Sequence, residues 1–155
     1  MKRVMRSFLI LFIAGTLLAQ CNKDEEVTLE NRMTLIANKK WVVVENVSVD
    51  SANHSTDLTQ DVPEFETDDY LLFNPDSTYE LNDNNILRSD SVSKIIDAGK
   101  WQLTSGGTEI MRESTVFNTT YPVATVKEIS ETTLYLETYS PSDRSFIRTR
   151  YRKSD

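Results

Sequence analysis

The most constraining feature of the chain is a regular succession, from Trp41 onward, of short segments rich in β-branched and aromatic residues, separated by turn-forming residues. Such segments favour β-strands because their side chains pack well on a pleated surface. Residues 69–81 (DYLLFNPDSTYEL) show the pattern most clearly, since Asn, Pro and Asp stand between two apolar runs. The sequence therefore predicts a β-hairpin over residues 69–81.

Six other segments share these features and are predicted to form strands: residues 40–49, 99–103, 108–113, 121–129, 133–139 and 145–152. With the two strands of the hairpin, they make about eight short strands joined by tight turns. Consecutive antiparallel strands of this kind favour a meander that closes into a barrel, because closure removes exposed sheet edges. We therefore predict an all-β antiparallel barrel. A sandwich of two sheets is the alternative.

Residues 27–38 form the one segment with helical periodicity. Leu29, Met33 and Ile36 recur at helical spacing, and Thr28 can cap the N-terminus of the helix. One short N-terminal helix is therefore expected to pack against the barrel. In the strand that follows, simple alternation places four apolar side chains on one face: Trp41, Val43, Val47 and Val49.

The N-terminus has the layout of a secretory signal. Residues 2–6 include three basic side chains, and residues 8–19 (FLILFIAGTLLA) form an apolar run. This run is shorter than the roughly 20 residues that a transmembrane helix needs. We expect a cleaved signal peptide at residues 1–20, with an uncleaved anchor helix as the alternative.

The only cysteine, Cys21, follows this leader directly. Residues 18–21 (LAQC) resemble the lipobox of bacterial lipoproteins, and residues 23–25 (KDE) resemble the export signal of Bacteroidota surface lipoproteins. The resemblance implies that Cys21 carries acyl chains such as palmitate, that residues 21–26 form a tether, and that the protein is anchored in the outer membrane at the cell surface. Two or more acyl chains anchor a protein firmly, whereas one holds it only marginally. A buried or incidental thiol is the alternative for Cys21.

Residues 27–155 would then form one domain, and most of it is similar to the lipocalin-like domains of small Bacteroidota surface lipoproteins. The resemblance rests on the Trp41 strand, the hairpin 71–81 (LLFNPDSTYEL), the strand 99–103 (GKWQL) and the hairpin 129–138 (ISETTLYLET). The Gly-x-Trp motif of the first lipocalin strand lacks its glycine here. The resemblance implies a lipocalin-like barrel but no activity, because function depends on sites rather than on folds.

The chain of 155 residues has a formal net charge of −7. Its first 20 residues contain three basic and no acidic side chains, so the remainder is more acidic than the whole. Nucleic-acid binding and electrostatic attachment to anionic lipids both need cationic surfaces, and the composition therefore argues against both. With a single cysteine no intrachain disulfide can form, and stability has to come from a hydrophobic core.

Aromatic residues at alternating strand positions are the candidate ligand-binding residues. Eight-stranded barrels either fill their interior with side chains or hold one small ligand. If a cavity exists, we expect its mouth near residues 51–68 and aromatic side chains on its walls. The candidates for these walls are Trp41, Phe73, Tyr79, Trp101, Tyr135 and Tyr151. A solid aromatic core is the alternative.

The sequence contains none of the common catalytic or metal-binding motifs. His54 is the only histidine, and neither a Gly-x-Ser-x-Gly elbow nor a His-Glu-x-x-His motif occurs. The acidic residues between positions 50 and 69 are interpreted as a solvated loop. We therefore expect no enzyme activity, metal or cofactor. Arg148, Arg150 and Arg152 share one face of the last strand and are expected to pair with neighbouring carboxylates.

These expectations combine into one functional hypothesis. The protein would be a lipid-anchored cell-envelope lipoprotein whose barrel binds a small apolar or aromatic ligand or a nutrient fragment. The alternative is a non-catalytic structural or interaction module that is accessory to an outer-membrane protein complex. A hollow interior favours the first hypothesis, and a packed interior favours the second.

Overall fold

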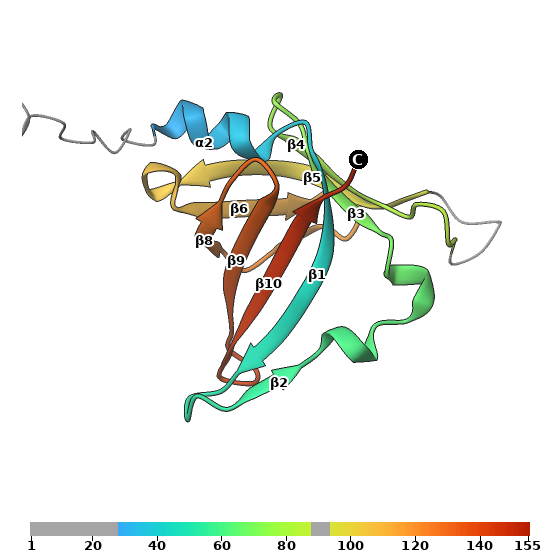
Figure 1. Cartoon of the computed structure of the whole chain (residues 1–155). Helices are drawn as coiled ribbons and strands as arrows, with labels where there is room; N and C mark the ends of the chain where they lie inside the picture. Colours follow the sequence, from blue (N-terminus) through green and yellow to red (C-terminus); the bar gives the residue numbers. More distant parts are fainter. Residues whose placement is uncertain (1–27, 88–93) are drawn as a thin grey trace, which may run out of the picture.

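In the computed structural model the chain forms a closed, eight-stranded antiparallel β-barrel with one short α-helix (Figure 1). The structure describes residues 28–87 and 94–155. The expected signal peptide, Cys21 and the tether lie outside these described residues. Among the described residues, no helix is long and apolar enough to cross a membrane.

Eight strands form the wall, each paired with the next: β1 (Lys40–Val49), β3 (Tyr70–Phe73), β4 (Thr78–Asn82), β5 (Ile95–Thr104), β6 (Glu109–Ser114), β8 (Ala124–Ile129), β9 (Thr133–Ser140) and β10 (Ser145–Lys153). Two short strands extend this wall. β2 (Ser55–Asp57) pairs with β1, and β7 (Thr119–Thr120) pairs with β6. The predicted antiparallel barrel is confirmed, and the sandwich alternative is wrong.

The first and last strands close the ring along almost their whole length. Antiparallel pairing with β10 runs from Trp41 to Val49 in β1. The Ser154 amide extends this ladder by donating to the Lys40 carbonyl at 2.8 Å. Closure satisfies the backbone groups that an open sheet would leave exposed at its two edges.

Helix α2 (Leu29–Ile36) lies across one end of the barrel (Figure 1). Thr28 caps it as predicted, since its hydroxyl accepts a hydrogen bond from the Asn31 amide at 3.3 Å. At the other end of the helix, Ile36 is fully buried and its carbonyl accepts the indole N–H of Trp41 at 2.9 Å. The helix therefore fixes the start of β1 and the orientation of its tryptophan.

The part of the barrel interior next to α2, which we call the packed region, is filled by side chains. The rings of Phe73 and Trp101 meet with 4.7 Å between their centroids. The Trp101 indole also donates a hydrogen bond to the Asn74 carbonyl at 2.9 Å. Full burial of one large apolar side chain contributes about 1.5–3 kcal/mol to stability. The largest fully buried strand residues of this region are Trp41, Phe73, Tyr79, Trp101, Ile110 and Leu134.

A β-bulge in β1 changes which side chains face the interior. The pairing register with β10 shifts between Val43 and Glu45, so that Val44 is the extra residue. Beyond the bulge it is Asn46, and not Val47, that faces the same interior space as Val43. The predicted single apolar face of this strand is therefore wrong beyond Val43. A bulge inverts the alternation, and the hydrophobic pattern carries no sign of it.

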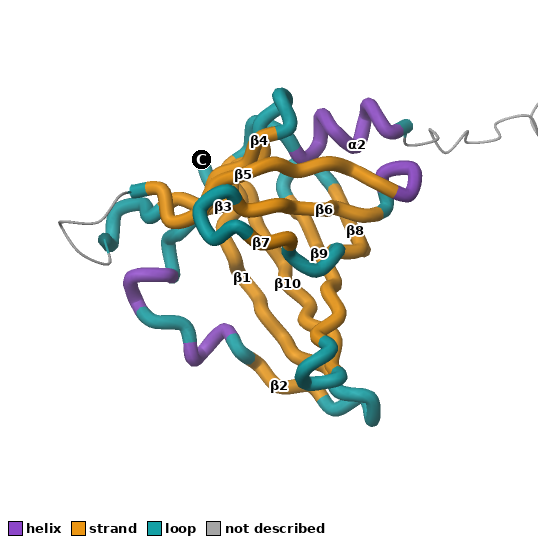
Figure 2. The backbone as a smooth tube through the Cα atoms, turned by 180° about the vertical axis from the view of Figure 1, so that it is seen from behind, coloured by secondary structure: helices purple, strands orange, loops and turns teal. Residues whose placement is uncertain are grey.

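A segment that we call the strap (residues 55–69) runs beside β1 from β2 to β3 (Figure 2). It contains β2 and two 3₁₀ turns, η1 (Thr59–Asp61) and η2 (Glu64–Glu66). β1 pairs with β3 near its start and with β2 near its end, and the strap spans the interval between these pairings. The Leu58 amide donates to the Asn46 carbonyl at 2.8 Å and thereby fixes the strap to β1.

Candidate ligand pocket

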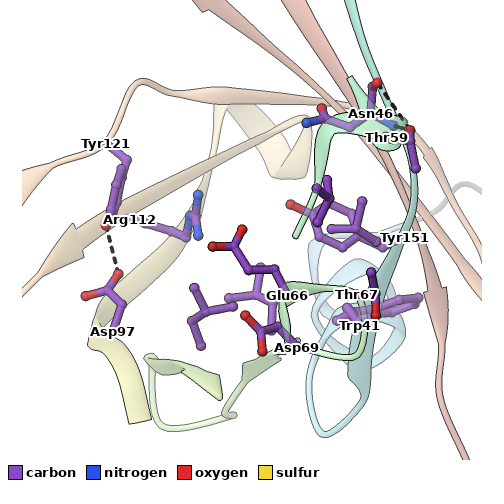
Figure 3. Close-up of a pocket in the computed structure, with 14 residues that line it drawn as sticks. Trp41, Asn46, Thr59, Glu66, Thr67, Asp69, Asp97, Arg112, Tyr121 and Tyr151 are labelled. Carbon is purple, nitrogen blue, oxygen red and sulfur yellow. Dashed lines mark hydrogen bonds between the residues drawn. The ribbon is translucent and has the colours of Figure 1, made fainter. Parts of the chain in front are cut away.

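A pocket of about 410 Å³ lies inside the barrel, between its walls and the strap (Figure 3). Pockets that bind small molecules have volumes of roughly 300–1,000 Å³. The segment that was expected at the mouth of a cavity, residues 51–68, includes most of the strap. The strap contributes five lining residues: Thr59, Val62, Glu66, Thr67 and Asp69.

One wall of the pocket is apolar. Trp41 and Leu71 are direct partners in the β1–β3 pairing, and both are buried. Val43 and Leu81 continue this wall, and Val62 adds to it from the strap. The hydrogen bond from the Trp41 indole to the end of α2 holds the largest of these side chains in place. The wall is therefore preformed, which reduces the side-chain entropy that the protein loses when a ligand binds.

Arg112 is the only cation among the described residues that line the pocket. It lies on β6 opposite Trp101 of β5, so its side chain faces the interior. Its guanidinium lies over the rings of Tyr121 and Tyr79, at 4.8 Å and 5.5 Å from their centroids. Within residues 28–87 and 94–155, the guanidinium makes no ion pair and no hydrogen bond. The structure thus stabilises the charge by contact with two aromatic rings, and its N–H groups have no hydrogen-bond partner among the described residues.

Asp97 on β5 is the centre of a buried hydrogen-bond cluster at the edge of the pocket. Its carboxylate accepts the hydroxyls of Tyr79 at 2.6 Å, Tyr121 at 2.9 Å and Ser114 at 2.5 Å. Burial acts to raise the pKa of Asp97, but these hydrogen bonds outweigh burial and lower it. Burial and the neighbouring Asp97 raise the pKa of both tyrosines. The acceptor capacity of Asp97 is therefore used within the protein.

Two further hydrogen-bond donors lie across the pocket from Arg112 (Figure 3). Burial raises the pKa of Tyr151, and the charge of Arg112 partly offsets this effect. No described residue forms a hydrogen bond with the Tyr151 hydroxyl. The Asn46 side-chain oxygen accepts from the Thr149 hydroxyl at 3.1 Å, which leaves the Asn46 amide N–H groups as donors. Three side chains with available donors thus face one space.

The strap brings two carboxylates to the pocket, Glu66 and Asp69, which both point towards its interior (Figure 3). Both make further interactions, so neither is free. Together with Asp97 they outnumber the single guanidinium of Arg112 in the lining. A ligand with several negative charges is therefore disfavoured, because like charges at short range repel strongly where water is excluded.

The aromatic residues predicted for the wall lie in three different places. Trp41 and Tyr151 line the pocket. Phe73, Tyr79 and Trp101 belong to the packed region beside it. Strand alternation identified these inward positions, but it could not show which of them face empty space.

Tyr135 lies on the outer face of the barrel, which corrects its predicted place on the wall. The guanidinium of Arg150 lies 4.3 Å from the centroid of its ring. Its neighbours Leu134 and Leu136 are buried and take the inward positions of β9. Because side chains alternate along a strand, the residue between them has to point outward.

The arginines of β10 also lie on the outer face. Two of the three, Arg148 and Arg150, pair with carboxylates as predicted. Arg148 contacts Glu137 with 2.8 Å between Nε and Oε2. Arg150 bridges Glu45 and Glu128 at 3.1 Å each. Exposed pairs of this kind contribute about 0–1 kcal/mol each. The charges of Arg148 and Arg150 are therefore paired within the protein.

The prediction from sequence missed the polar residues of the pocket: Asn46, Asp97, Arg112 and Tyr121. For Arg112 a signal was present, because it occupies an inward position of β6 between Ile110 and Ser114, which are both buried. A charged residue between two buried residues on the inward face of a strand is unusual for a packed core. For Asn46 the bulge removed any such signal.

His54 lies apart from the pocket, whereas two of the acidic residues between positions 50 and 69, Glu66 and Asp69, line it. This corrects the interpretation of the whole acidic segment as a solvated loop. The His54 ring contacts the Asp50 carboxylate at 3.2 Å on an exposed loop, and His54 does not line the pocket. Among the described residues, no group of three or more His, Cys, Asp or Glu side chains is placed to hold a metal ion. Neither protein-family models nor curated proteins give a match to the chain. The chemistry of the pocket is therefore the main guide to function.

Proposed function

We propose that this protein is a lipid-anchored envelope lipoprotein whose barrel binds a small molecule with an apolar or aromatic body, without transforming it. The observation that carries this proposal is the pocket of about 410 Å³ inside a closed barrel. Its volume lies within the range of small-molecule sites, and residues of both the barrel wall and the strap face it. Here the void has a preformed apolar wall on one side and hydrogen-bond donors on the other.

The polar residues of the pocket support binding rather than catalysis. General-base catalysis on a hydroxyl needs a base that is within hydrogen-bond reach and free to take the proton. The carboxylate of Asp97 is already shared among three hydroxyls, and its lowered pKa makes it a weak base. The only histidine is elsewhere, on an exposed loop. An arrangement of this kind recognises a molecule by shape and hydrogen bonds.

Binding is tested with two valine variants that differ only in position. Val43 lines the pocket and is 39% exposed, whereas Val44, its neighbour in the bulge, is 40% exposed and does not line the pocket. In the full-length protein, Val43→Trp should fill part of the cavity and weaken binding of the neutral fluorophore N-phenyl-1-naphthylamine by about tenfold or more. Val44→Trp should bind the probe like the wild type.

The readout is the emission of the probe, titrated into each protein at equal concentration. Equal affinity of the two variants would show that the probe binds elsewhere, and absence of binding by the wild type would contradict the proposal. Mass spectrometry of small molecules that co-purify from the native membrane then identifies the physiological ligand.

Membrane attachment is a separate part of the proposal and depends on the residues before the barrel. Its support is the sequence of residues 18–21 and the firm anchoring that two or more acyl chains provide. Cys21→Ser should remove the lipid, so the protein should leave the membrane fraction and lose the mass of its acyl chains. Unchanged fractionation and mass would refute the anchor without affecting the ligand-binding proposal.

The alternative is an interaction module that is accessory to an outer-membrane complex. Three exposed apolar side chains near β7 favour it, namely Val116, Phe117 and Val123, which are 54%, 58% and 44% exposed. Reproducible cross-links from this region to a single envelope protein, together with an absence of bound small molecules, would support this alternative over ligand binding.

A further inference from the structure

Arg112 is an inward-facing charge that forms no ion pair among the described residues. Buried and half-buried charges are normally paired, because removing an unpaired ion from water is energetically unfavourable. Arg112 instead rests on the rings of Tyr79 and Tyr121. Cation–π contacts of this kind stabilise the charge without occupying the hydrogen-bonding capacity of its N–H groups. The N–H groups in its plane keep their hydrogen-bonding capacity.

The carboxylates of the pocket do not supply the missing partner. Asp97 accepts three hydroxyls, and Tyr79 and Tyr121 serve both Asp97 and Arg112. The two tyrosines therefore contact both the negative and the positive group, and Asp97 and Arg112 form no ion pair among the described residues. Glu66 and Asp69 make other interactions and form no ion pair with Arg112 among the described residues.

The donors across the pocket face the same space as Arg112. The charge of Arg112 acts on the Tyr151 hydroxyl, which has no described hydrogen-bond partner. Asn46 lies beside Tyr151 and has amide N–H groups to donate (Figure 3). Apolar surface from Trp41 and Leu71 borders this space. The pocket therefore offers a cationic, donor-rich end and an apolar wall to one bound molecule.

We propose that the ligand of this pocket carries a carboxylate that accepts hydrogen bonds from the Arg112 guanidinium and the Tyr151 hydroxyl, while its apolar body lies against Trp41 and Leu71. This inference rests on the proposed ligand-binding function and specifies the chemical class of the ligand. The planar guanidinium matches a carboxylate in a bidentate arrangement. A phosphate would bring up to two negative charges beside Glu66 and Asp69, whereas a carboxylate brings only one.

The test compares two probes that share one aromatic body, 2-naphthoate and 2-naphthamide. Both are titrated into the full-length wild-type protein at pH 7 by calorimetry. The acid is expected to bind about tenfold or more tightly than the amide, because hydrogen bonds to a charged group are stronger than those to a neutral one. This comparison needs no variant and is therefore independent of any effect of mutation on folding.

Variants then assign the preference to one side chain. Arg112→Gln should lower the affinity for 2-naphthoate to that for 2-naphthamide. Arg112→Lys should retain part of the preference for the acid over the amide. Arg150→Gln, which removes an arginine from the outer face, is the matched control and should keep all of it. Circular dichroism establishes that each variant is folded.

The outcomes separate the two proposals. Equal binding of acid and amide by the wild type would overturn the carboxylate inference and leave ligand binding standing. A preference that survives in folded Arg112→Gln would also overturn it. Binding of neither naphthyl probe nor the neutral fluorophore would overturn the inference together with the function on which it rests.

Discussion

The barrel interior contains a packed region and a hollow one, and single strands contribute to both. On β6, Ile110 is buried in the packed region, whereas Arg112, two residues later on the same face, lines the pocket. At the border between the two regions, Asp97 accepts hydrogen bonds from three hydroxyls within the protein. In the pocket, donors are left without described partners. This difference indicates that the side chains at individual inward positions determine function, and not the barrel fold itself.

The largest effect is expected from removing a ring in the packed region. Phe73→Ala should lower the free energy of unfolding by about 3–5 kcal/mol. Phe73 is fully buried against Trp101, so its removal leaves a cavity in the packed region. Urea denaturation followed by fluorescence measures this change. Phe117→Ala is the matched control, since Phe117 is 58% exposed and its loss should change stability by less than about 0.5 kcal/mol. Similar effects of the two substitutions would mean that the packed region is not the core.

The next effect concerns the buried polar cluster. Asp97→Asn should cost about 2–3 kcal/mol, because an amide cannot accept all three hydroxyls and leaves at least one donor unsatisfied. Asp143→Asn offers a control on the surface, where the Asp143 carboxylate accepts only exposed serine hydroxyls. Its substitution should be nearly neutral. If both variants unfold at the same urea concentration, the cluster does not contribute to stability.

The same cluster predicts how stability depends on acid. The pKa of Asp97 is lower in the folded protein than its usual value, because hydrogen bonds from Ser114, Tyr79 and Tyr121 overcome the effect of burial. A depressed folded pKa gives stability that is present above the unfolded pKa, near pH 4, and is lost as pH falls through the folded value. Wild-type protein should therefore lose more stability than Asp97→Asn between about pH 5 and pH 2. Parallel pH profiles of the two proteins would contradict this assignment.

The smallest effect on stability is expected in the hollow region. Arg112→Met should change the free energy of unfolding by less than about 1 kcal/mol, because the lost cation–π contacts are offset by removal of a partly buried charge. Thermal unfolding without ligand measures this difference. A loss as large as that of Asp97→Asn would instead make Arg112 a structural residue and would blur the distinction between the two regions.

Much of the fold was predictable because local signals and tertiary structure agree. The hairpin at residues 70–82 formed where Asn74 and Asp76 mark a turn, and Thr28 capped the helix. Eight strands with tight connections then leave few arrangements besides a closed meander. The bulge at Val44 was not predictable, because it arises from pairing with a strand that lies a hundred residues away.

The pocket was less predictable than the barrel. Alternation gave the inward side of each strand, but the empty volume results from the strap covering the interval between two pairings of β1. Aromatic content pointed to the packed region, where rings such as Phe73 and Trp101 fill space. The functional candidates are instead the polar residues at inward positions, such as Arg112 and Asn46. A charged residue at an inward strand position is thus a better guide to a site than an aromatic one.

The junction of β1 and β10 has a consequence for how the chain reaches this structure. The hydrogen bond between Asn46 and Thr149 joins residues that are 103 positions apart. Contacts of such long sequence separation form late, because the entropy of closing a large loop is lost before the contacts contribute any favourable energy. Until residues 145–153 dock, the valine-rich edge of β1 is open to pairing with other molecules. We therefore expect misassembly during folding to begin at the first and last strands of the barrel.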